Sequence, residues 1–126
     1  MVCYRKYEEV FLDTIDTARS IVDLVADKKG ENIVLMDLRD VSLIADFFII
    51  ASASNERLLN AITDHIRDEM KQRQQLYPLR TEGRGENGWV LMDYGDVVVH
   101  LFSPEVRSYY DLEALWRDAN VLVHVQ

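Results

Sequence analysis

The residues best suited to chemistry gather in one stretch, WVLMDYGDVVVHLF, from Trp89 to Phe102. Two carboxylates, Asp93 and Asp96, lie three positions apart, and such a pair could hold a metal ion if both side chains converged. The stretch also contains a tryptophan and a histidine, and aromatic anchors ringed by polar groups are typical of protein-binding surfaces. Two uses are therefore open: metal chemistry by paired carboxylates, and protein docking.

Alternating residues on both sides of Gly95 predict a β-hairpin. Because glycine accepts a positive φ, we expect Tyr94 and Gly95 to form a two-residue turn. This turn pairs Asp93 with Asp96 and Trp89 with His100. A type I turn with a bulge at Gly95 is the alternative, and it would shift the pairing by one residue. The first register is preferred because it separates aliphatic from polar side chains.

The preferred register predicts two unlike faces, since successive side chains of a strand point to opposite sides. One face is purely aliphatic and is expected in the core: Val90, Met92, Val97, Val99 and Leu101. The other is mixed and, with the turn residue Tyr94, supplies the candidate protein-binding residues: Trp89, Leu91, Asp93, Tyr94, Asp96, Val98 and His100. We expect Trp89 to be the anchor of this surface. The alternative is that a terminal helix covers the face.

Other reactive residues give little support for catalysis. The three histidines, His65, His100 and His124, show no H-x-x-x-H or H-E-x-x-H spacing, so no zinc site is predicted. The single cysteine, Cys3, has no histidine close in sequence and cannot form an intramolecular disulfide. We therefore expect no catalytic residue, no metal and no cofactor.

Periodic apolar residues predict the elements that position the hairpin. Spacings of three and four predict helices over residues 7–28 and from Ser54 or Asn55 to about residue 74. Apolar runs at 33–38 and 46–52 predict buried strands, and residues 77–82 a weak edge strand. After the hairpin, Ser103 and Pro104 begin a helix that is broken near Asp111, and residues 121–125 form a last strand. The order indicates an α/β fold, a single mixed sheet with helices packed on it, in one domain over residues 1–126.

Composition narrows the classes of partner. The chain has 126 residues, of which 48% are hydrophobic, and this suits one folded domain with a real core. A formal net charge of −8 argues against binding of free nucleic acid, which needs a positive footprint, but allows docking on a basic protein. No apolar run approaches the ~20 residues of a membrane span, and residues 1–10 do not resemble a secretory signal. A cytoplasmic location is expected.

Several motifs together resemble the Iojap family, also called ribosomal silencing factor (RsfS), from about Tyr7 to Ala119. They are ADFFIIASAS (45–54), ITDHI (62–66), Glu82-Gly83, GWVLMDYGDVVVHLF (88–102) and VRSYYDLEALW (106–116). Two positions depart from the family pattern, because Ala53 stands where glycine is common and Leu58 where histidine is frequent. Arg107, Tyr109 and Tyr110 belong to the last motif and are additional candidates for the binding surface. The alternatives are that they cap the sheet or lie on a solvated helix face.

The resemblance implies a function that the spacing of residues in the sequence does not reveal. Members of the family bind the large ribosomal subunit through its ribosomal protein fourteen, block joining of the small subunit and lower translation when nutrients are scarce. A nucleotidyltransferase-like domain without the catalytic set is implied, often as a homodimer, and in a dimer Trp89 could instead anchor the second copy. The alternative is a nucleotidyltransferase-type enzyme that uses Asp93 and Asp96 with a metal. Its usual Gly-Ser before a helix is altered here at Ala53.

Overall fold

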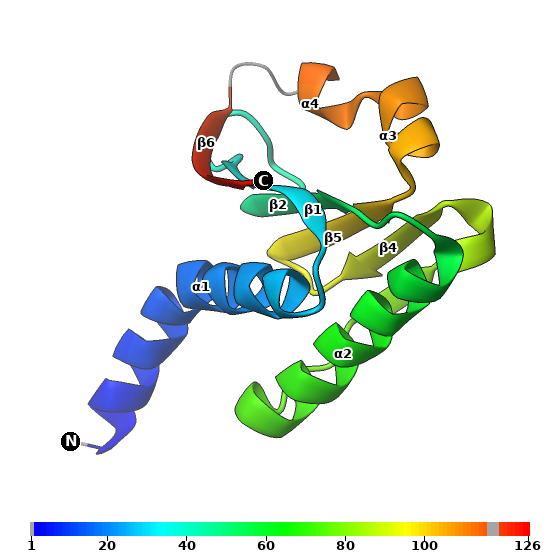
Figure 1. The fold of residues 1–126 in the computed structure, drawn as a ribbon. Helices are drawn as coiled ribbons and strands as arrows, with labels where there is room; N and C mark the ends of the chain where they lie inside the picture. Colours follow the sequence, from blue (N-terminus) through cyan, green and yellow to red (C-terminus); the bar gives the residue numbers. More distant parts are fainter. Residues whose placement is uncertain (1, 116–118) are drawn as a thin grey trace.

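The protein folds as one six-stranded sheet with helices on both faces (Figure 1). The computed structural model describes the backbone of residues 2–115 and 119–126, and the side chains of residues 14–114 and 119–126. The helical elements are α1 (Val2–Asp27), α2 (Glu56–Gln74), the 3₁₀ turn η1 (Gly85–Asn87), α3 (Pro104–Tyr110) and α4 (Leu112–Leu115). The strands are β1 (Glu31–Asp37), β2 (Phe47–Ser52), β3 (Arg80–Glu82), β4 (Trp89–Asp93), β5 (Val97–Phe102) and β6 (Asn120–Val125).

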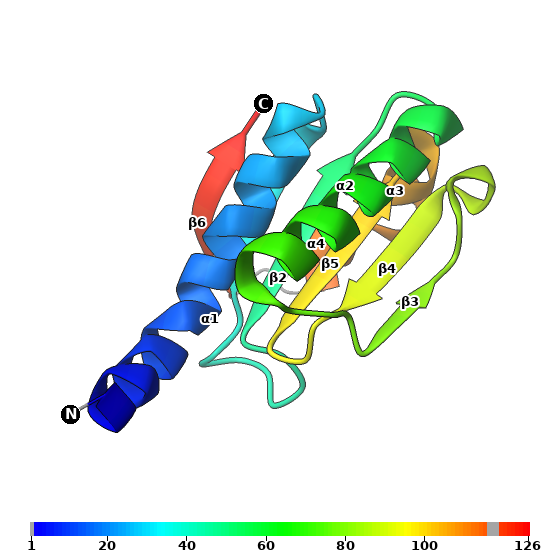
Figure 2. The ribbon, with the colours of Figure 1, turned by 90° about the horizontal axis from the view of Figure 1, so that it is seen from below.

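The sheet is mixed, as the sequence predicts, in the order β3-β4-β5-β2-β1-β6. Strands β2 and β5 run parallel, and the other neighbouring pairs are antiparallel. Helices α1 and α2 lie side by side across one face, while α3 and α4 lie on the other (Figures 1 and 2). We call these the helix-covered face and the second face. Among the described helices, none combines the length and apolar character needed to cross a membrane.

The helix-covered face contains the larger core. Residues at helical spacing on α1 and α2, such as Ile21, Leu24, Ile62 and Ile66, are fully buried against the sheet. The predicted cap of α2 is confirmed at Asn55, whose side-chain oxygen accepts a hydrogen bond of 2.8 Å from the amide of Leu58. These two helices exclude water from the central strands and make the sheet a rigid platform for the second face.

The hairpin turn lies one residue later than predicted. Gly95 and Asp96 are its central residues, the amide of Tyr94 bonds to the carbonyl of Val97 at 2.9 Å, and Gly95 has φ +92°. The predicted register is therefore wrong by two residues: Trp89 lies opposite Phe102, and Asp93 lies opposite Val98. Glycine alone supplies the positive φ at the first central position, so tyrosine never has to adopt it.

The predicted faces nevertheless hold, because a shift of two residues preserves alternation. The aliphatic set, from Val90 to Leu101, is buried in the helix-covered core. Asp96 and Tyr94 are exceptions. Asp96, predicted on the mixed face, borders a small hollow on the helix-covered side. Tyr94 lies in the helix-covered core with an exposed fraction of 9%, although the sequence predicts it at the turn as part of the binding surface. Burial raises the pKa of its phenol to about 12.

Other predicted elements are confirmed with shifted ends. The Ser103 hydroxyl caps α3 by accepting a hydrogen bond of 3.3 Å from the Val106 amide. As predicted, the helix is interrupted at Asp111, which has φ +47°. The weak edge strand shortens to β3, after Pro78, and the tail forms β6 beside β1. The last residue of the VRSYYDLEALW motif, Trp116, lies outside the described residues.

Gly83 offers a direct test of how the start of β4 is positioned. It has φ +81°, and a Cβ there would collide with the carbonyl oxygen of Trp89. We expect Gly83→Ala to lower the free energy of unfolding by at least about 2 kcal/mol, from left-handed backbone strain together with the clash. Urea denaturation followed by circular dichroism measures this loss.

Gly95→Ala is the matched control, because Gly95 also has positive φ but a Cβ there would meet only a Leu79 methyl at 3.6 Å. Its cost is expected near 1 kcal/mol, from backbone strain alone. Equal losses in the two variants would contradict the role assigned to Gly83.

Candidate functional site

The predicted binding residues on the second face differ in solvent exposure. Trp89, Leu91 and Asp93 on β4 are half-buried and reach the surface. Their neighbours on β5, Val98 and His100, have exposed fractions of only 8% and 4%. The β4 side chains are therefore accessible from solvent, whereas Val98 and His100 lie beneath them in the sheet.

Trp89 is held in place by three aromatic neighbours. Its ring stacks on Phe102 with 5.1 Å between centroids and lies 4.7 Å from the ring of Tyr110 on α3. Its indole Nε1 donates a hydrogen bond of 3.2 Å to Nδ1 of His100. The indole is thus oriented before any partner arrives, which reduces the entropy lost on binding.

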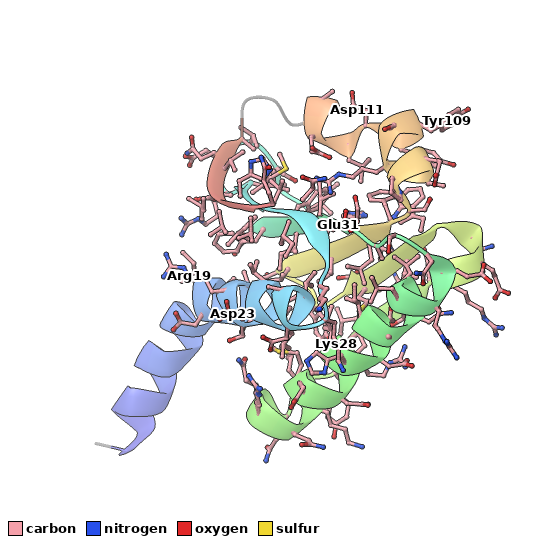
Figure 3. All side chains as sticks on the ribbon, viewed as in Figure 1. Arg19, Asp23, Lys28, Glu31, Tyr109 and Asp111 are labelled. Atoms are coloured by element: carbon pink, nitrogen blue, oxygen red, sulfur yellow. The ribbon has the colours of Figure 1, made fainter. Side chains whose placement is uncertain are left out.

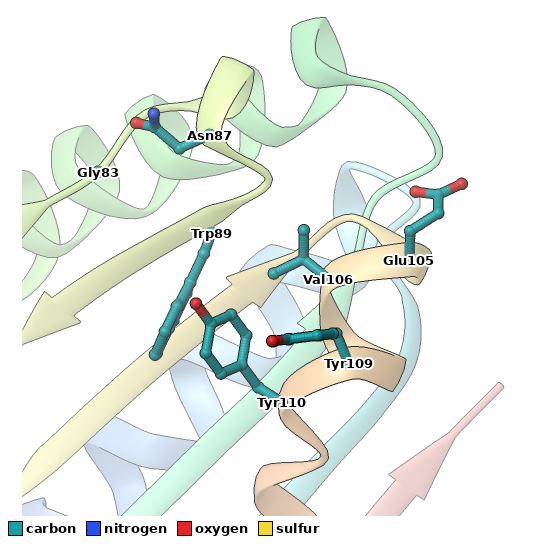
Figure 4. A pocket seen from close by; sticks show the side chains of 7 residues that line it. All are labelled: Gly83, Asn87, Trp89, Glu105, Val106, Tyr109 and Tyr110. Atoms are coloured by element: carbon teal, nitrogen blue, oxygen red, sulfur yellow. The ribbon is translucent and has the colours of Figure 1, made fainter.

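A shallow apolar groove borders the outer side of Trp89, with a volume of about 560 Å³. We call it the Trp89 groove, and its lining comes from the β3–β4 connection, from β4 and from α3: Gly83, Asn87, Trp89, Glu105, Val106, Tyr109 and Tyr110. Figure 4 shows Trp89 and Tyr110 facing each other, with Tyr109 one residue back along α3. Tyr109 is 82% exposed. A second hollow of about 200 Å³, lined by Glu82, Gly83, Trp89 and Leu91, lies beside the same tryptophan.

Part of this lining was not predicted. Tyr110 and Tyr109 were candidates, but Asn87, Glu105 and Val106 were not singled out. Asn87 enters because the η1 turn brings it to the edge of the groove, and its side chain also accepts a bond of 3.0 Å from the amide of Arg84. Val106 could have been suspected from its place in the VRSYY motif. Glu105 shows in sequence only as a favourable residue in the first turn of a helix.

Arg107, the other additional candidate, does not line the Trp89 groove. Its guanidinium Nε bonds to Glu113 at 2.9 Å, and its Nη1 bonds to the Ser52 hydroxyl at 2.9 Å and to the Asn32 carbonyl at 2.7 Å. The side chain is 12% exposed. It therefore ties α3 and α4 to β1 and β2, and it borders a separate polar hollow with Asp111 and His124.

The two aspartates of the hairpin lie in different surroundings. One oxygen of Asp93 accepts a bond of 2.7 Å from the Gly95 amide, and the other lies 3.5 Å from Nε of Arg80. Asp96 borders a small hollow with Thr14, Thr17 and Leu76, at the helix-covered face. The predicted pairing of the two residues across the hairpin does not form. Within the described residues, no three His, Cys, Asp or Glu side chains group as metal ligands would.

His100 is the buried polar group of the site. Burial lowers its pKa to about 4, so the ring is neutral at pH 7. Because Nδ1 accepts from Trp89, the proton of the neutral ring lies on Nε2, which has no hydrogen-bond partner among the described residues. Phe48 lies edge-on against the ring at 4.8 Å. The histidine is therefore a positioning residue for the indole.

The chain matches a known family over most of its length. The fold is a mixed α/β domain with an aromatic groove, and the family model described as ribosomal silencing factor during starvation, RsfS, matches residues 12–126. The protein belongs to the RsfS family. The expectation from the sequence motifs is confirmed.

Individual relatives agree with this assignment. Ribosomal silencing factor RsfS of Halalkalibacterium halodurans is 44% identical over 98 residues, which cover 78% of this chain and 83% of the relative. A mouse protein named "Mitochondrial assembly of ribosomal large subunit protein 1" is 29% identical, over 76% of this chain and 43% of its own length. A crystal structure of a Chromobacterium violaceum protein superposes with a TM-score of 0.76 and 32% identity, over 80% of this chain and 83% of that one.

The buried histidine makes the stability of the protein depend on pH. Its folded pKa of about 4 lies below the ordinary histidine value of 6.5, so the unfolded chain binds a proton more readily. Above pH 6.5 the ring is neutral in both the folded and the unfolded chain, so its burial costs no stability through protonation. As the pH falls from about 6.5 towards 4, the unfolded chain takes up the proton first and the free energy of unfolding decreases. We expect a loss of about 3 kcal/mol over this window from His100 alone.

The variant His100→Gln keeps an acceptor for Trp89 and removes this titration. Urea midpoints measured between pH 7.5 and pH 4 should fall less steeply for the variant than for the wild type. Parallel curves for the two proteins would contradict the assignment.

Proposed function

We propose that the protein docks on the large ribosomal subunit through the Trp89 groove and sterically keeps the small subunit from joining, and so represses translation in the cytoplasm when nutrients are scarce. The partner is a basic ribosomal protein, the counterpart of ribosomal protein fourteen. The observation that carries the proposal is a half-buried tryptophan, oriented by three aromatic neighbours at the edge of an exposed aromatic groove. Family membership supports the ribosome as the target.

The chemistry of the groove favours a cationic partner. The faces of Trp89, Tyr109 and Tyr110 attract a guanidinium or ammonium group, and a desolvated contact of this kind is worth about 2 kcal/mol. Glu105 borders the same groove, and Glu82 borders the adjoining hollow. With a net charge of −8, the protein also attracts a basic surface at long range. Arginine or lysine side chains of the ribosomal protein are the expected occupants.

Occlusion requires a durable contact rather than a reaction. The described surroundings of Asp93 and Asp96 favour this interpretation, because Asp93 is engaged by Gly95 and Arg80 while Asp96 lies at a separate hollow. We therefore propose a binding protein that is not an enzyme and acts without a cofactor. Asp93 then has a local structural role in the turn and supplies charge at the edge of the docking surface.

Removal of the anchor should weaken binding strongly. We expect Trp89→Ala to raise the dissociation constant for isolated large subunits by about thirtyfold or more, as for other central aromatic anchors. Tyr109→Ala is the companion variant, because Tyr109 is 82% exposed and its truncation leaves the core intact. Cosedimentation with separated large and small subunits measures binding, and light scattering measures subunit joining.

Tyr77→Ala is the matched control, an exposed tyrosine that does not line the groove. It should bind within about twofold of the wild type. Circular dichroism confirms that each variant is folded, which matters for Trp89 because it packs on Phe102. A folded Trp89→Ala protein that binds large subunits as tightly as the wild type, or a wild type that sediments with small subunits, would refute the proposal.

A further inference from the structure

Strands β2 and β5 are parallel neighbours, but the chain leaves them towards opposite faces of the sheet. After β2 it enters α2 on the helix-covered face, and after β5 it enters α3 on the second face (Figures 1 and 2). Where neighbouring parallel strands diverge in this way, a crevice opens beyond their carboxyl ends, and α/β proteins commonly bind ligands there. The carboxyl ends of β2 and β5 are therefore a favourable position for a ligand.

A polar hollow of about 340 Å³ lies at this position, and we call it the Arg107 hollow. Ser52, the last residue of β2, and Pro104, the first residue of α3, both line it. Its other lining residues come from β1, from β6 and from the segment that contains α3 and α4: Asn32, Arg107, Ser108, Asp111, Glu113 and His124. None of them lines the Trp89 groove, so the two sites are distinct.

Strand β1 bulges where it borders the Arg107 hollow. Between Glu31 and Val34 it has one residue more than the segment of β2 with which it pairs. Asn32 lies in this bulge with φ +49°, and its carbonyl oxygen accepts a bond of 2.7 Å from Arg107. Bulges interrupt regular pairing and are common beside active sites. Here the bulge frees a carbonyl oxygen that holds a cation in the hollow.

Arg107 is a fixed cation at the wall of the hollow. Of the five N–H donors of its guanidinium, Nε bonds to Glu113 and Nη1 bonds to Asn32 and Ser52. The two donors of Nη2 make no hydrogen bond within the described residues. Because three bonds already hold the side chain, it loses little freedom when a ligand binds. A guanidinium with two free donors is well suited to a carboxylate.

Two carboxylates border the same hollow. Glu113 is bonded to Arg107, whereas Asp111 forms no ion pair within the described side chains. Asp111 lies at the turn between α3 and α4 (Figure 3). One guanidinium against two carboxylates leaves a negative balance, which disfavours a multiply charged anion such as phosphate and favours a ligand with an ammonium group. Asp111, Glu113 and His124 do not come together as metal ligands would.

We propose that the Arg107 hollow binds a free α-amino acid with a small, polar side chain. The carboxylate of the ligand bonds to Nη2 of Arg107, and its ammonium group pairs with Asp111. A volume of about 340 Å³ is near the lower end for ligand sites, so it limits the ligand to a small molecule. The polar lining gives a long apolar side chain little to pack against. This inference is independent of the docking function proposed for the Trp89 groove.

Titration of the ¹⁵N-labelled full chain with serine, followed by amide chemical shifts, tests the proposal. Saturable shifts are expected at lining residues such as Asn32, Ser108 and Asp111, with a dissociation constant of about 1 mM or below. Ethanolamine lacks the carboxylate of serine, and 3-hydroxypropionate lacks its ammonium group. Each should bind at least about tenfold more weakly than serine, because each loses one of the two ion pairs.

Asp111→Asn removes the charge that pairs with the ammonium group. Asparagine tolerates the positive φ of this position, so the turn is preserved. The variant should bind serine about tenfold more weakly than the wild type, while its binding of 3-hydroxypropionate should not weaken. Asp40→Asn is the matched control, because it removes the same charge from an exposed residue outside the hollow. It should bind serine like the wild type.

Four results would overturn the proposal. Equal binding of ethanolamine and serine would indicate a simple cation site, and tighter binding of inorganic phosphate would indicate a simple anion site. An equal loss in Asp40→Asn would indicate an effect of overall charge. The fourth is the absence of saturable shifts at the hollow up to about 20 mM serine. The titration uses the free protein, so failure of the docking proposal leaves its outcome unchanged.

Discussion

The parallel pairing of β2 with β5 is the constraint on which the rest of the structure depends. It runs in unbroken register from Phe47 opposite Val97 to Ser52 opposite Phe102. A parallel pair cannot be closed by a tight turn, so the chain must travel through α2, β3 and β4 before β5 can form. Both strands then end at the same edge, where the Ala53 amide bonds to the Phe102 carbonyl at 2.8 Å. This is why α2 and α3 begin at neighbouring positions.

The Trp89 groove follows from that geometry. Phe102 ends β5 directly opposite Trp89, and α3 begins two residues later. The short helix therefore folds back over the end of the hairpin and brings Tyr110 against the indole. Arg107 fixes this placement by reaching Ser52 and Asn32 on the central strands. The groove is thus built by the sheet and by the bonds of Arg107 that hold α3 against it, and not by any local motif.

The two faces of the sheet have different physical purposes. Two long helices bury the helix-covered face and provide most of the apolar core, which makes the platform stable and stiff. The second face has a smaller core around Phe102 and Ile50, with Trp89, Phe48 and Val106 only partly buried. His100 lies within it as a neutral, incompletely paired group, a destabilising feature that is tolerated where it orients Trp89.

The sequence by itself determined the periodic elements, the faces of the hairpin and the family. Alternation is a local property, so Val90, Met92 and Val99 fell on the buried face even though the predicted register was wrong by two residues. Cap residues such as Asn55 and Ser103 are also local, because they bond to amides three residues away. Glycine, serine and asparagine therefore predicted turns and helix starts correctly, because these features depend only on residues close in sequence.

Only the tertiary structure decided which residues reach the surface together. The position of Tyr94 in the core follows from the true turn at Gly95-Asp96 and the helices above it. The separation of Arg107 from Tyr110, and the entry of Asn87 and Glu105 into the groove, depend on contacts between segments distant in sequence. Likewise β6 was visible as a tail strand, but its position at an open edge beside β1 was not. Exposure is a property of the assembled neighbours, and no residue's own type or spacing specifies it.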